Sequence, residues 1–316
     1  MSSLAARRAS NSSLLRSLSY LPVGVFVGGT SGIGQGMAEA FATHTQGNAH
    51  IVIIGRNKTA AEAIIAKFPR PSSAEAKHEF VPCDVTLMEN VQNTTRELLS
   101  RIPRINFLVL STGYTTMKER DETSEGIDRK MAVHYYARWK FIDDLIPALK
   151  KAQSEGEDAK VYSVLAPGNG GKIKVDDLGL KKAYSKAHFA LAGPTYNDLM
   201  MEEFAERNTG IPFIHANPGI VDTGYLSNSE SSLVRYVSKA TFPIAKILLR
   251  PIMPVLSPQA AGENMLHGLL TTANGGRAWR LDEHGEDMGQ KRYYGTPEER
   301  KALWDHTVEE IKRVQK

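Results

Sequence analysis

Cysteine is almost absent from this sequence, because Cys83 is the single cysteine among 316 residues. A lone cysteine cannot form a disulfide within its own chain, and no metal-ligand spacing surrounds this one. Folds stabilised by internal disulfides are therefore excluded, and we expect no metal site. The shortage of cysteine also fits a reducing compartment, so we expect a cytoplasmic protein.

Long apolar runs and a strong charge of one sign are also missing. The nearest apolar candidate, 237–256, is broken by lysines, an arginine and three prolines. It therefore lacks the roughly 18 uninterrupted apolar residues of a membrane span. The formal net charge is only +4 and is spread along the chain, whereas nucleic-acid-binding proteins gather basic residues on one surface. We expect neither a membrane span nor a nucleic-acid partner.

Acidic residues are missing from the N-terminal segment, where the first one is Glu39. Residues 1–20 are rich in serine and contain arginines, which is typical of a transit peptide. Four leucines between residues 14 and 21 also fall at roughly helical spacing, which indicates a short amphipathic helix leading into the first strand. Both interpretations stay open, and the helix is preferred.

What the sequence does contain is an alternation of short apolar runs and helical patterns from residue 23 to about 217. Strands are expected at 23–27, 50–54, 79–83, 107–110, 160–165, 212–216 and 276–279. Helices are expected at 35–43, 59–67, 88–101, 126–150, 184–207, 226–257 and 297–314. This order predicts an α/β fold, a doubly wound Rossmann-type parallel sheet with helices on both faces. With no internal repeat or low-complexity linker, we expect a single domain over 23–316 after an N-terminal extension at 1–22.

The first expected strand runs directly into a glycine-rich turn, Gly28-Gly29-Thr30-Ser31-Gly32-Ile33-Gly34. Glycines let the chain turn sharply, so that backbone N–H groups at a helix N-terminus can approach a pyrophosphate. A plain glycine turn is the alternative, but the strand before it and the helix after it favour a phosphate cradle. The predicted cofactor contacts in this turn are Gly28, Thr30, Ser31, Gly32, Ile33 and Gly34.

This turn resembles the T-G-x-x-x-G-x-G fingerprint of the short-chain dehydrogenase/reductase family, with Val27 in place of the threonine. Further markers of the family follow in its own order over about 23–223. They are Gly55-Arg56-Asn57, Cys83-Asp84-Val85, Leu110-Ser111-Thr112-Gly113 and Asn217-Pro218-Gly219-Ile220-Val221-Asp222-Thr223.

The resemblance implies a nicotinamide cofactor and residues that hold it. Arg56, followed by Asn57, stands where the family places an arginine for the 2′-phosphate of NADP, and no acidic residue ends that strand. NADPH is therefore the expected cofactor, with a merely solvated arginine as the alternative. The other implied contacts are Asp84 and Val85 at the adenine, Gly113 in the loop after the fourth strand, and Pro218, Gly219, Val221 and Thr223 at the nicotinamide amide.

The catalytic positions of the family are mostly changed in this chain. Family reductases use asparagine, serine, tyrosine and lysine, and the tyrosine passes a proton to the substrate oxygen while the nicotinamide delivers hydride. Alignment to the family pattern gives, in that order, His134, Ala166, Tyr184 and His188.

Tyr184 and His188 are four residues apart and would share one face of the expected helix, whereas Lys186 would point away. A histidine of near-neutral pKa can donate or relay a proton. We therefore predict a Tyr184–His188–His134 acid/base cluster beside the nicotinamide. The alternative is that these are ordinary surface or core histidines in a domain whose chemistry has drifted.

Within the family, the chain is similar to a set of fungal members, many linked to secondary metabolism, in which the tyrosine and lysine are often missing. Four segments carry this resemblance: Arg8-x-x-Asn11, the loop from Phe26 to Gly34, Tyr135-Tyr136-Ala137-Arg138 and His215-x-x-Pro218-Gly219.

We predict an NADPH-dependent oxidoreductase that reduces a carbonyl or conjugated alkene of a small, largely apolar metabolite. The apolar segment 226–257 would be the substrate lid, with packing as an ordinary core helix pair as the alternative. Two other functions stay open: a cofactor-holding isomerase or cyclase without net redox chemistry, and a non-catalytic NADPH-binding protein. The sequence does not fix the oligomeric state, and a homodimer is one option.

Overall fold

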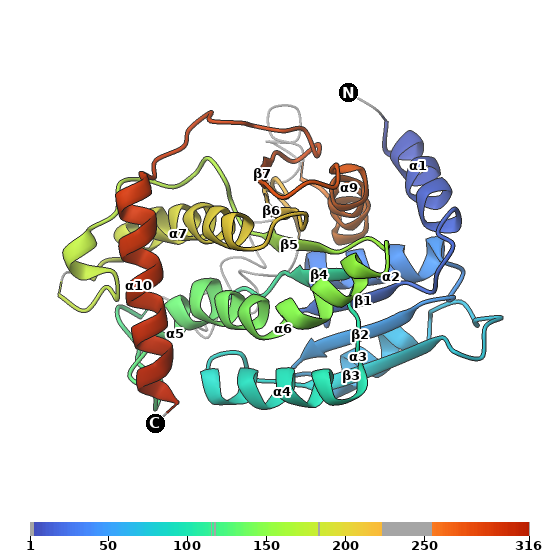
Figure 1. The fold of residues 1–316 in the computed structure, drawn as a ribbon, viewed down its shortest axis with the longest axis horizontal. Helices are drawn as coiled ribbons and strands as arrows, with labels where there is room; N and C mark the ends of the chain where they lie inside the picture. The colour runs from blue at the N-terminus through green and yellow to red at the C-terminus, as the bar shows by residue number, and fades with distance from the viewer. Residues whose placement is uncertain (1–2, 115, 117, 183, 223–254, 316) are drawn as a thin grey trace, which may run out of the picture.

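The computed structural model describes residues 3–114, 116, 118–182, 184–222 and 255–315. These residues form one parallel sheet with helices on both faces (Figure 1). The strands are β1 (Val23–Val27), β2 (His50–Gly55), β3 (Lys77–Pro82), β4 (Phe107–Leu110), β5 (Lys160–Val164), β6 (Phe213–Ala216) and β7 (Ala278–Leu281). The helices are α1 (Leu4–Arg16), α2 (Gly32–His44), α3 (Lys58–Ile65), α4 (Met88–Arg101), α5 (Arg129–Met131), α6 (Ala137–Ser154), α7 (Lys186–Arg207), α9 (Pro258–Thr271) and α10 (Pro297–Val314).

The strands lie in the order β3-β2-β1-β4-β5-β6-β7, and every neighbouring pair is parallel. This confirms the predicted Rossmann-type fold. All residues of β1, β4, β5 and β6 are buried, which explains why these strands are mostly apolar in the sequence. The chain leaves β1 in one direction for β2 and returns to its other side for β4. In such sheets the crevice at this reversal, outside the carboxyl ends of the strands, is where ligands bind.

Each face of the sheet has its own apolar core. One core joins the sheet to α4, α6, α7 and α10, and the other joins it to α1, α2, α3 and α9. Successive side chains of a strand point to opposite faces, so Val25 belongs to the first core and its neighbour Phe26 to the second. Within the described part of the chain, none of the helices has the length and apolarity that a bilayer crossing requires.

The structure corrects several predicted elements. The helix expected at 126–150 is divided into α5, a π-helical turn (Ala132–Tyr136) and α6, which runs on to Ser154. The helix expected from residue 184 begins at Lys186 instead, because the Ser185 side chain accepts a hydrogen bond from the His188 backbone N–H and caps it there. Helix α9 was missed altogether. Most of the predicted lid, 226–257, lies outside the described residues.

The preferred interpretation of the N-terminal segment, a helix, is confirmed by α1 over residues 4–16, but its contacts are not those of a leucine stripe. Its buried face consists of Arg7, Asn11 and Leu15, and the helix ends before the last two leucines of the predicted pattern. The helix packs on α9 and α2. The N-terminal segment therefore joins the core through Leu15 and two polar side chains.

Glu263 of α9 is the centre of that contact. Its carboxylate accepts hydrogen bonds from Asn11 at 3.0 Å and from His44 of α2 at 2.9 Å, and it pairs with Arg8 at 3.2 Å. Burial raises the pKa of Glu263, but the hydrogen bonds from His44 and Asn11 and the charge of Arg8 outweigh it and hold the pKa below the usual value. The carboxylate thus joins three helices.

Helices α2 and α9 cross at two glycines. A Cβ atom on Gly36 of α2 would collide with the backbone oxygen of Pro258, and one on Gly262 of α9 would collide with the backbone of Gly36. The helices therefore touch backbone to backbone. This contact fixes α2, whose N-terminus faces the crevice at the end of β1.

Candidate functional site

A cavity of about 550 Å³ runs along the carboxyl ends of the strands. It is formed by loops that follow β1 to β6, which brings together segments far apart in the sequence. Many of the residues predicted to bind the cofactor line it: Gly28, Thr30, Ser31, Gly32, Ile33, Arg56, Asp84, Val85, Gly113, Pro218, Gly219 and Val221. Thr223 lies outside the described residues.

The glycine turn after β1 leaves the start of α2 open to the cavity. Gly28 and Gly32 have φ of +87° and +58°, in the left-handed region that glycine adopts readily. Gly34 does not line the cavity, because it packs against the backbone of Gly28 and the Ser111 side chain, where a Cβ would collide. The N-cap residue Ser31 gives α2 no side-chain hydrogen bond. The first N–H groups of α2 are therefore available to an anion, which the helix dipole also favours.

Arg56 and Asp84 lie at the ends of β2 and β3, on one side of the cavity. Arg56 is exposed, and among the described residues no carboxylate forms an ion pair with it. The Asp84 carboxylate accepts a hydrogen bond from the Thr86 backbone N–H at 3.1 Å, which holds it in a tight turn. Asn57 is not part of the lining, since its side chain accepts from the Ala60 N–H at 3.0 Å and caps α3.

The loop after β6 forms the opposite side of the cavity. Gly219 has a φ of +70°, and its N–H donates to the Asn217 side chain at 3.0 Å. Val221 forms an isolated parallel bridge with Leu256, which holds this loop beside the start of α9. The Pro218-Gly219 turn is thereby fixed against the cavity wall.

His134 is the one member of the predicted catalytic cluster that lines the cavity. It lies in the π-helical turn and is buried. Its Nδ1 donates to the Lys130 carbonyl at 2.9 Å, and its Nε2 accepts from the Tyr114 backbone N–H at 3.5 Å. Burial, with a smaller effect from the Arg138 guanidinium, lowers the pKa of His134 to about 4. The imidazole is therefore neutral near neutral pH, which contradicts the near-neutral pKa expected from the sequence.

Tyr184 and His188 do not line the cavity in the described part of the chain. Tyr184 precedes the N-cap of α7, so it does not share a helical face with His188, and the spacing argument for the pair fails. The Tyr184 ring lies under the Lys130 ammonium, 4.9 Å from it, and burial raises the pKa of its hydroxyl. Ala166, at the expected serine position, is held by its backbone: its N–H donates to His215 at 3.2 Å.

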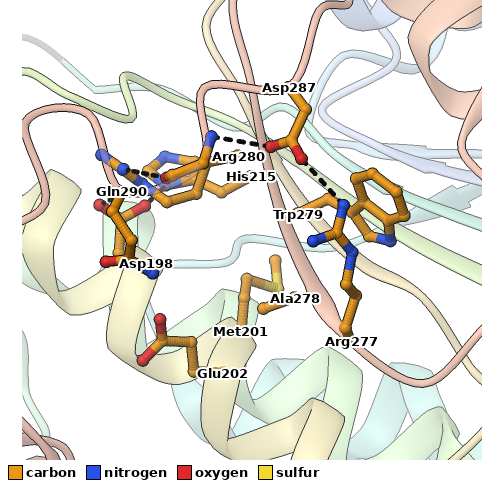
Figure 2. Close-up of a pocket in the computed structure, with 11 residues that line it drawn as sticks. Asp198, Met201, Glu202, His215, Arg277, Ala278, Trp279, Arg280, Asp287 and Gln290 are labelled. Atoms are coloured by element: carbon orange, nitrogen blue, oxygen red, sulfur yellow. Dashed lines mark hydrogen bonds and ion pairs between the residues drawn. The ribbon is translucent and has the colours of Figure 1, made fainter.

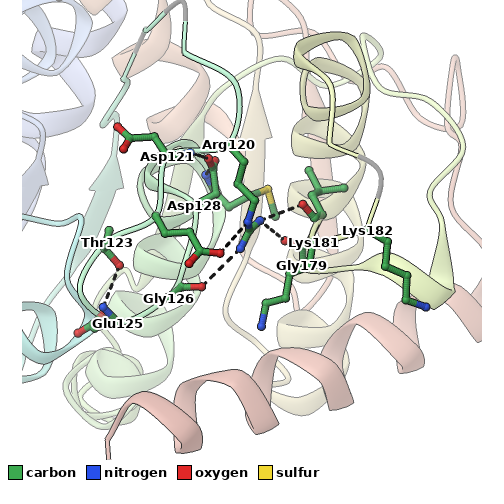
Figure 3. A network of polar contacts seen from close by, with 12 residues as sticks. Arg120, Asp121, Thr123, Glu125, Gly126, Asp128, Gly179, Lys181 and Lys182 are labelled. Carbon is green, nitrogen blue, oxygen red and sulfur yellow. Dashed lines mark hydrogen bonds and ion pairs between the residues drawn. The ribbon is translucent and has the colours of Figure 1, made fainter.

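The loop that contains Tyr184 is tied to the segment before α5. Arg120 donates to the carbonyls of Gly179 and Leu180, both at 2.9 Å, and pairs with Glu122 at 2.9 Å (Figure 3). Asp128 caps α5 through the N–H groups of Lys130 and Met131. These contacts hold Lys130 over the Tyr184 ring, at a position that the sequence did not predict.

A second polar cluster lies between β6, β7 and α7. The His215 Nδ1 donates to Asp198 at 2.6 Å, and Asp198 also pairs with Arg280 of β7 at 3.1 Å (Figure 2). Burial lowers the pKa of His215, although Asp198 acts in the opposite direction. The adjoining cavity holds only about 60 Å³, the space of a few water molecules. This cluster braces β6, β7 and the Ala166 backbone.

Several cavity residues were not predicted from the sequence. Ser111, Thr112, Tyr114 and Val133 come from the β4 loop and the π-helical turn. Cys83 and Thr86 follow β3, and Val164 and Leu165 lie at the end of β5. The family fingerprint keeps only a glycine in the β4 loop, so the fingerprint could not mark the others. The position of that loop, at the end of a central buried strand, is the signal that could have found them.

A family model described as short chain dehydrogenase matches residues 23–233. The chain belongs to the short-chain dehydrogenase family. It is accordingly an oxidoreductase of that family.

An oxidoreductase of Emericella nidulans is 33% identical over 229 residues, which cover 72% of this chain and 66% of the relative. The oxidoreductase andH of Emericella variicolor is 31% identical over 79% of this chain and 70% of its own length. The solved L-sorbose reductase of Gluconobacter frateurii, in complex with NADPH and L-sorbose, has a TM-score of 0.58 and 18% identity over 83% of this chain and 95% of that one. This last similarity shows the shared fold. The similarity to fungal relatives agrees with the resemblance drawn from the sequence.

Proposed function

We propose that this short-chain dehydrogenase binds NADPH and reduces a carbonyl or conjugated alkene of a small, largely apolar metabolite, in secondary metabolism. The observation that carries the cofactor choice is Arg56, an exposed arginine at the cavity edge where β2 ends, with no acidic residue beside it. An arginine in this position favours a 2′-phosphate, whereas a carboxylate would favour the free ribose hydroxyl of NADH.

The residues present fit a dinucleotide. The glycine turn keeps side chains out of the start of α2, whose N–H groups would bind the pyrophosphate. Asp84 would lie at the adenine, Arg56 at the 2′-phosphate, and the Pro218-Gly219 turn at the nicotinamide. The bound cofactor would supply hydride. The protein's own part is to orient the two reactants and to place a proton donor by the substrate oxygen.

The cofactor choice is tested by measuring the dissociation constants of NADPH and NADH by fluorescence titration. We expect NADPH to bind more tightly, and Arg56→Ala to weaken NADPH about tenfold to a hundredfold while leaving NADH nearly unchanged, because a charge-assisted contact to phosphate is lost. Arg70→Ala is the matched control, since Arg70 is exposed but does not line the cavity. Equal affinity of the unmutated protein for both cofactors would refute the proposed preference.

The redox activity is tested separately, by following NADPH absorbance with a panel of ketones, quinones and enones. Consumption of NADPH supports the reductase. A product formed without cofactor consumption would favour the isomerase or cyclase, and NADPH binding without any product would favour a non-catalytic protein.

A further inference from the structure

The proton donor of the proposed reduction should lie in the cavity, and the order of the strands indicates which end of the cavity holds it. This inference rests on the proposed function. Arg56 follows β2, which lies on one side of β1, whereas β4, β5 and β6 lie on the other side. If Arg56 binds the phosphate on the adenosine ribose, the reacting end of the cofactor extends toward the carboxyl ends of β4 to β6.

Titratable side chains of the cavity fall into two groups along this direction. On the side of β2 and β3, the described lining contains Arg56, Cys83 and Asp84. On the side of β4 to β6, the described lining contains two, Tyr114 and His134. Among the described residues, a titratable proton donor at the reacting end therefore comes from this second pair, since Tyr184 and His188 are not part of the described lining.

His134 is unsuited to the role, because its single proton is already in use. Its Nδ1 lies 2.9 Å from the Lys130 carbonyl, which can only accept, so Nδ1 carries the proton. The other nitrogen, Nε2, then accepts, and the Tyr114 N–H is its donor at 3.5 Å. A second proton would require a buried imidazolium beside Arg138, and burial lowers the pKa of His134 to about 4. His134 instead positions the Tyr114 backbone.

We propose that the Tyr114 hydroxyl is the proton donor of this enzyme. Tyr114 directly follows Gly113 after β4, lines the cavity, and packs partly buried against the core of α4, α6, α7 and α10. In the reduction of a ketone, hydride from NADPH forms the new C–H bond, and the C=O π electrons move onto the oxygen. The Tyr114 O–H bond breaks and its proton forms the O–H bond of the alcohol. A hydronium ion from the solvent would then return a proton to the phenolate and leave as water, so that one solvent proton is consumed for each NADPH oxidised to NADP⁺.

The test compares Tyr114→Phe with Tyr184→Phe, since each removes one hydroxyl and keeps the ring. Turnover is measured with NADPH and 9,10-phenanthrenequinone as the carbonyl probe. We expect Tyr114→Phe to lower kcat by about 10²–10⁴-fold, with an unchanged dissociation constant for NADPH and an unchanged melting temperature. Tyr184→Phe is expected to retain the unmutated rate. Full activity of Tyr114→Phe, or a loss confined to Tyr184→Phe, would overturn the proposal.

A binding measurement gives a readout that does not depend on turnover. Isobutyramide is an unreactive carbonyl ligand whose oxygen accepts a hydrogen bond, and its affinity is measured with the NADPH-loaded protein. Loss of one donor is expected to weaken it about threefold to tenfold in Tyr114→Phe and not in Tyr184→Phe. If the unmutated protein consumes no NADPH with any probe, the proposed reduction fails. The amide then decides the donor by itself: weakening in Tyr114→Phe alone supports the inference, and equal affinity in all three proteins refutes it.

Discussion

Polar side chains around the cavity largely form hydrogen bonds with backbone groups. His134 donates to the carbonyl of Lys130, and Arg138, which is almost fully buried, donates to the carbonyls of Thr112 and Val164. These contacts fix the π-helical turn against the ends of β4 and β5. Because a buried donor without a partner costs free energy, these side chains hold the cavity wall in shape.

The burial of His134 predicts how its protonation affects stability. Its pKa is about 4 in the folded chain and about 6.5 when unfolded. The unfolded chain therefore binds this proton more readily, and the stabilisation is complete above pH 6.5 and is lost as the pH falls toward 4. Between pH 7.5 and pH 5 the free energy of unfolding should fall by about 2 kcal/mol more in the unmutated protein than in His134→Asn, as measured by urea unfolding.

Asparagine suits this comparison because it does not titrate and its amide can donate to the same carbonyl. Other histidines titrate equally in both proteins and cancel in the difference. An identical loss of stability in both proteins would mean that the pKa of His134 is the same in the folded and the unfolded chain, and His134 would then return as a candidate proton donor.

At the level of residues, the sequence predicted cofactor contacts better than catalytic ones. Glycine, arginine and aspartate at strand ends are local signals, and the strand before each one defines its place. The expected pairing of Tyr184 with His188 depended on where a helix begins, and the Ser185 cap moves that start to Lys186. Such a shift of two residues is within the ordinary uncertainty of helix ends, but it leaves Tyr184 outside the helix.

At the scale of elements, three segments that resemble fungal relatives prove to be contacts between helices or strands. Arg8 and Asn11 bind Glu263 and join α1 to α9. Tyr135 and Tyr136 reach α10, at Thr307 and His306, in hydrogen bonds of 2.7 and 2.8 Å. His215 connects β6 to Asp198 of α7. The residues of these motifs therefore hold helices and strands together. The resemblance that they carry does not by itself specify a reaction.

Element types were largely predictable because the central strands are mostly apolar and several flanking helices follow the 3.6-residue pattern. Helix α9 escaped prediction because its buried face includes Glu263 and Asn264 beside small residues, so the apolar period is interrupted. Those polar residues are satisfied by α1, which is distant in sequence. A pattern read along the chain cannot anticipate a partner that only the fold supplies.

The glycine contact between α2 and α9 makes a prediction about both stability and binding. Gly262→Ala should destabilise the protein by about 3 kcal/mol, because the new methyl group would meet the backbone of Gly36. Since α2 carries the phosphate cradle, its displacement should also weaken NADPH. Chemical denaturation and fluorescence titration measure the two effects.

Gly193→Ala is the matched control, because this glycine also lies inside a helix but its Cβ would meet none of the described residues within 4 Å. It should gain up to about 1 kcal/mol from the lower flexibility of the unfolded chain and keep its cofactor affinity. Equal behaviour of the two alanine variants would contradict the close crossing of α2 and α9.

At the scale of the whole molecule, two apolar cores share one sheet. Phe41 lies in the core of α2, where its ring is 5.6 Å from Phe26 and 5.7 Å from Phe107. Trp139 of α6 and Trp304 of α10 lie on the other face, with their ring centroids 5.2 Å apart. Because each strand contributes side chains to both cores, unfolding of one core should unfold the other with it.

This arrangement predicts a single unfolding transition. In a Trp279→Phe background, tryptophan fluorescence reports only the face with Trp139 and Trp304. Phe41→Ala, on the opposite face, should cost about 3–5 kcal/mol and shift the fluorescence midpoint as much as the far-UV circular dichroism midpoint. Two separate midpoints in urea would show that the two faces unfold independently.

The hydrogen-bonded contact between α1 and α9 has a consequence for the synthesis of the protein. Arg7 donates to Asn264 at 2.8 Å, across 257 positions of the chain. A ribosome adding about 5–20 residues per second reaches that partner about 13–50 s after it has passed Arg7. Throughout that interval Arg7 and Asn11 of the first helix lack their hydrogen-bond partners on α9. The segment is thus accessible to a chaperone or a protease until α9 has been synthesised and can pair with it.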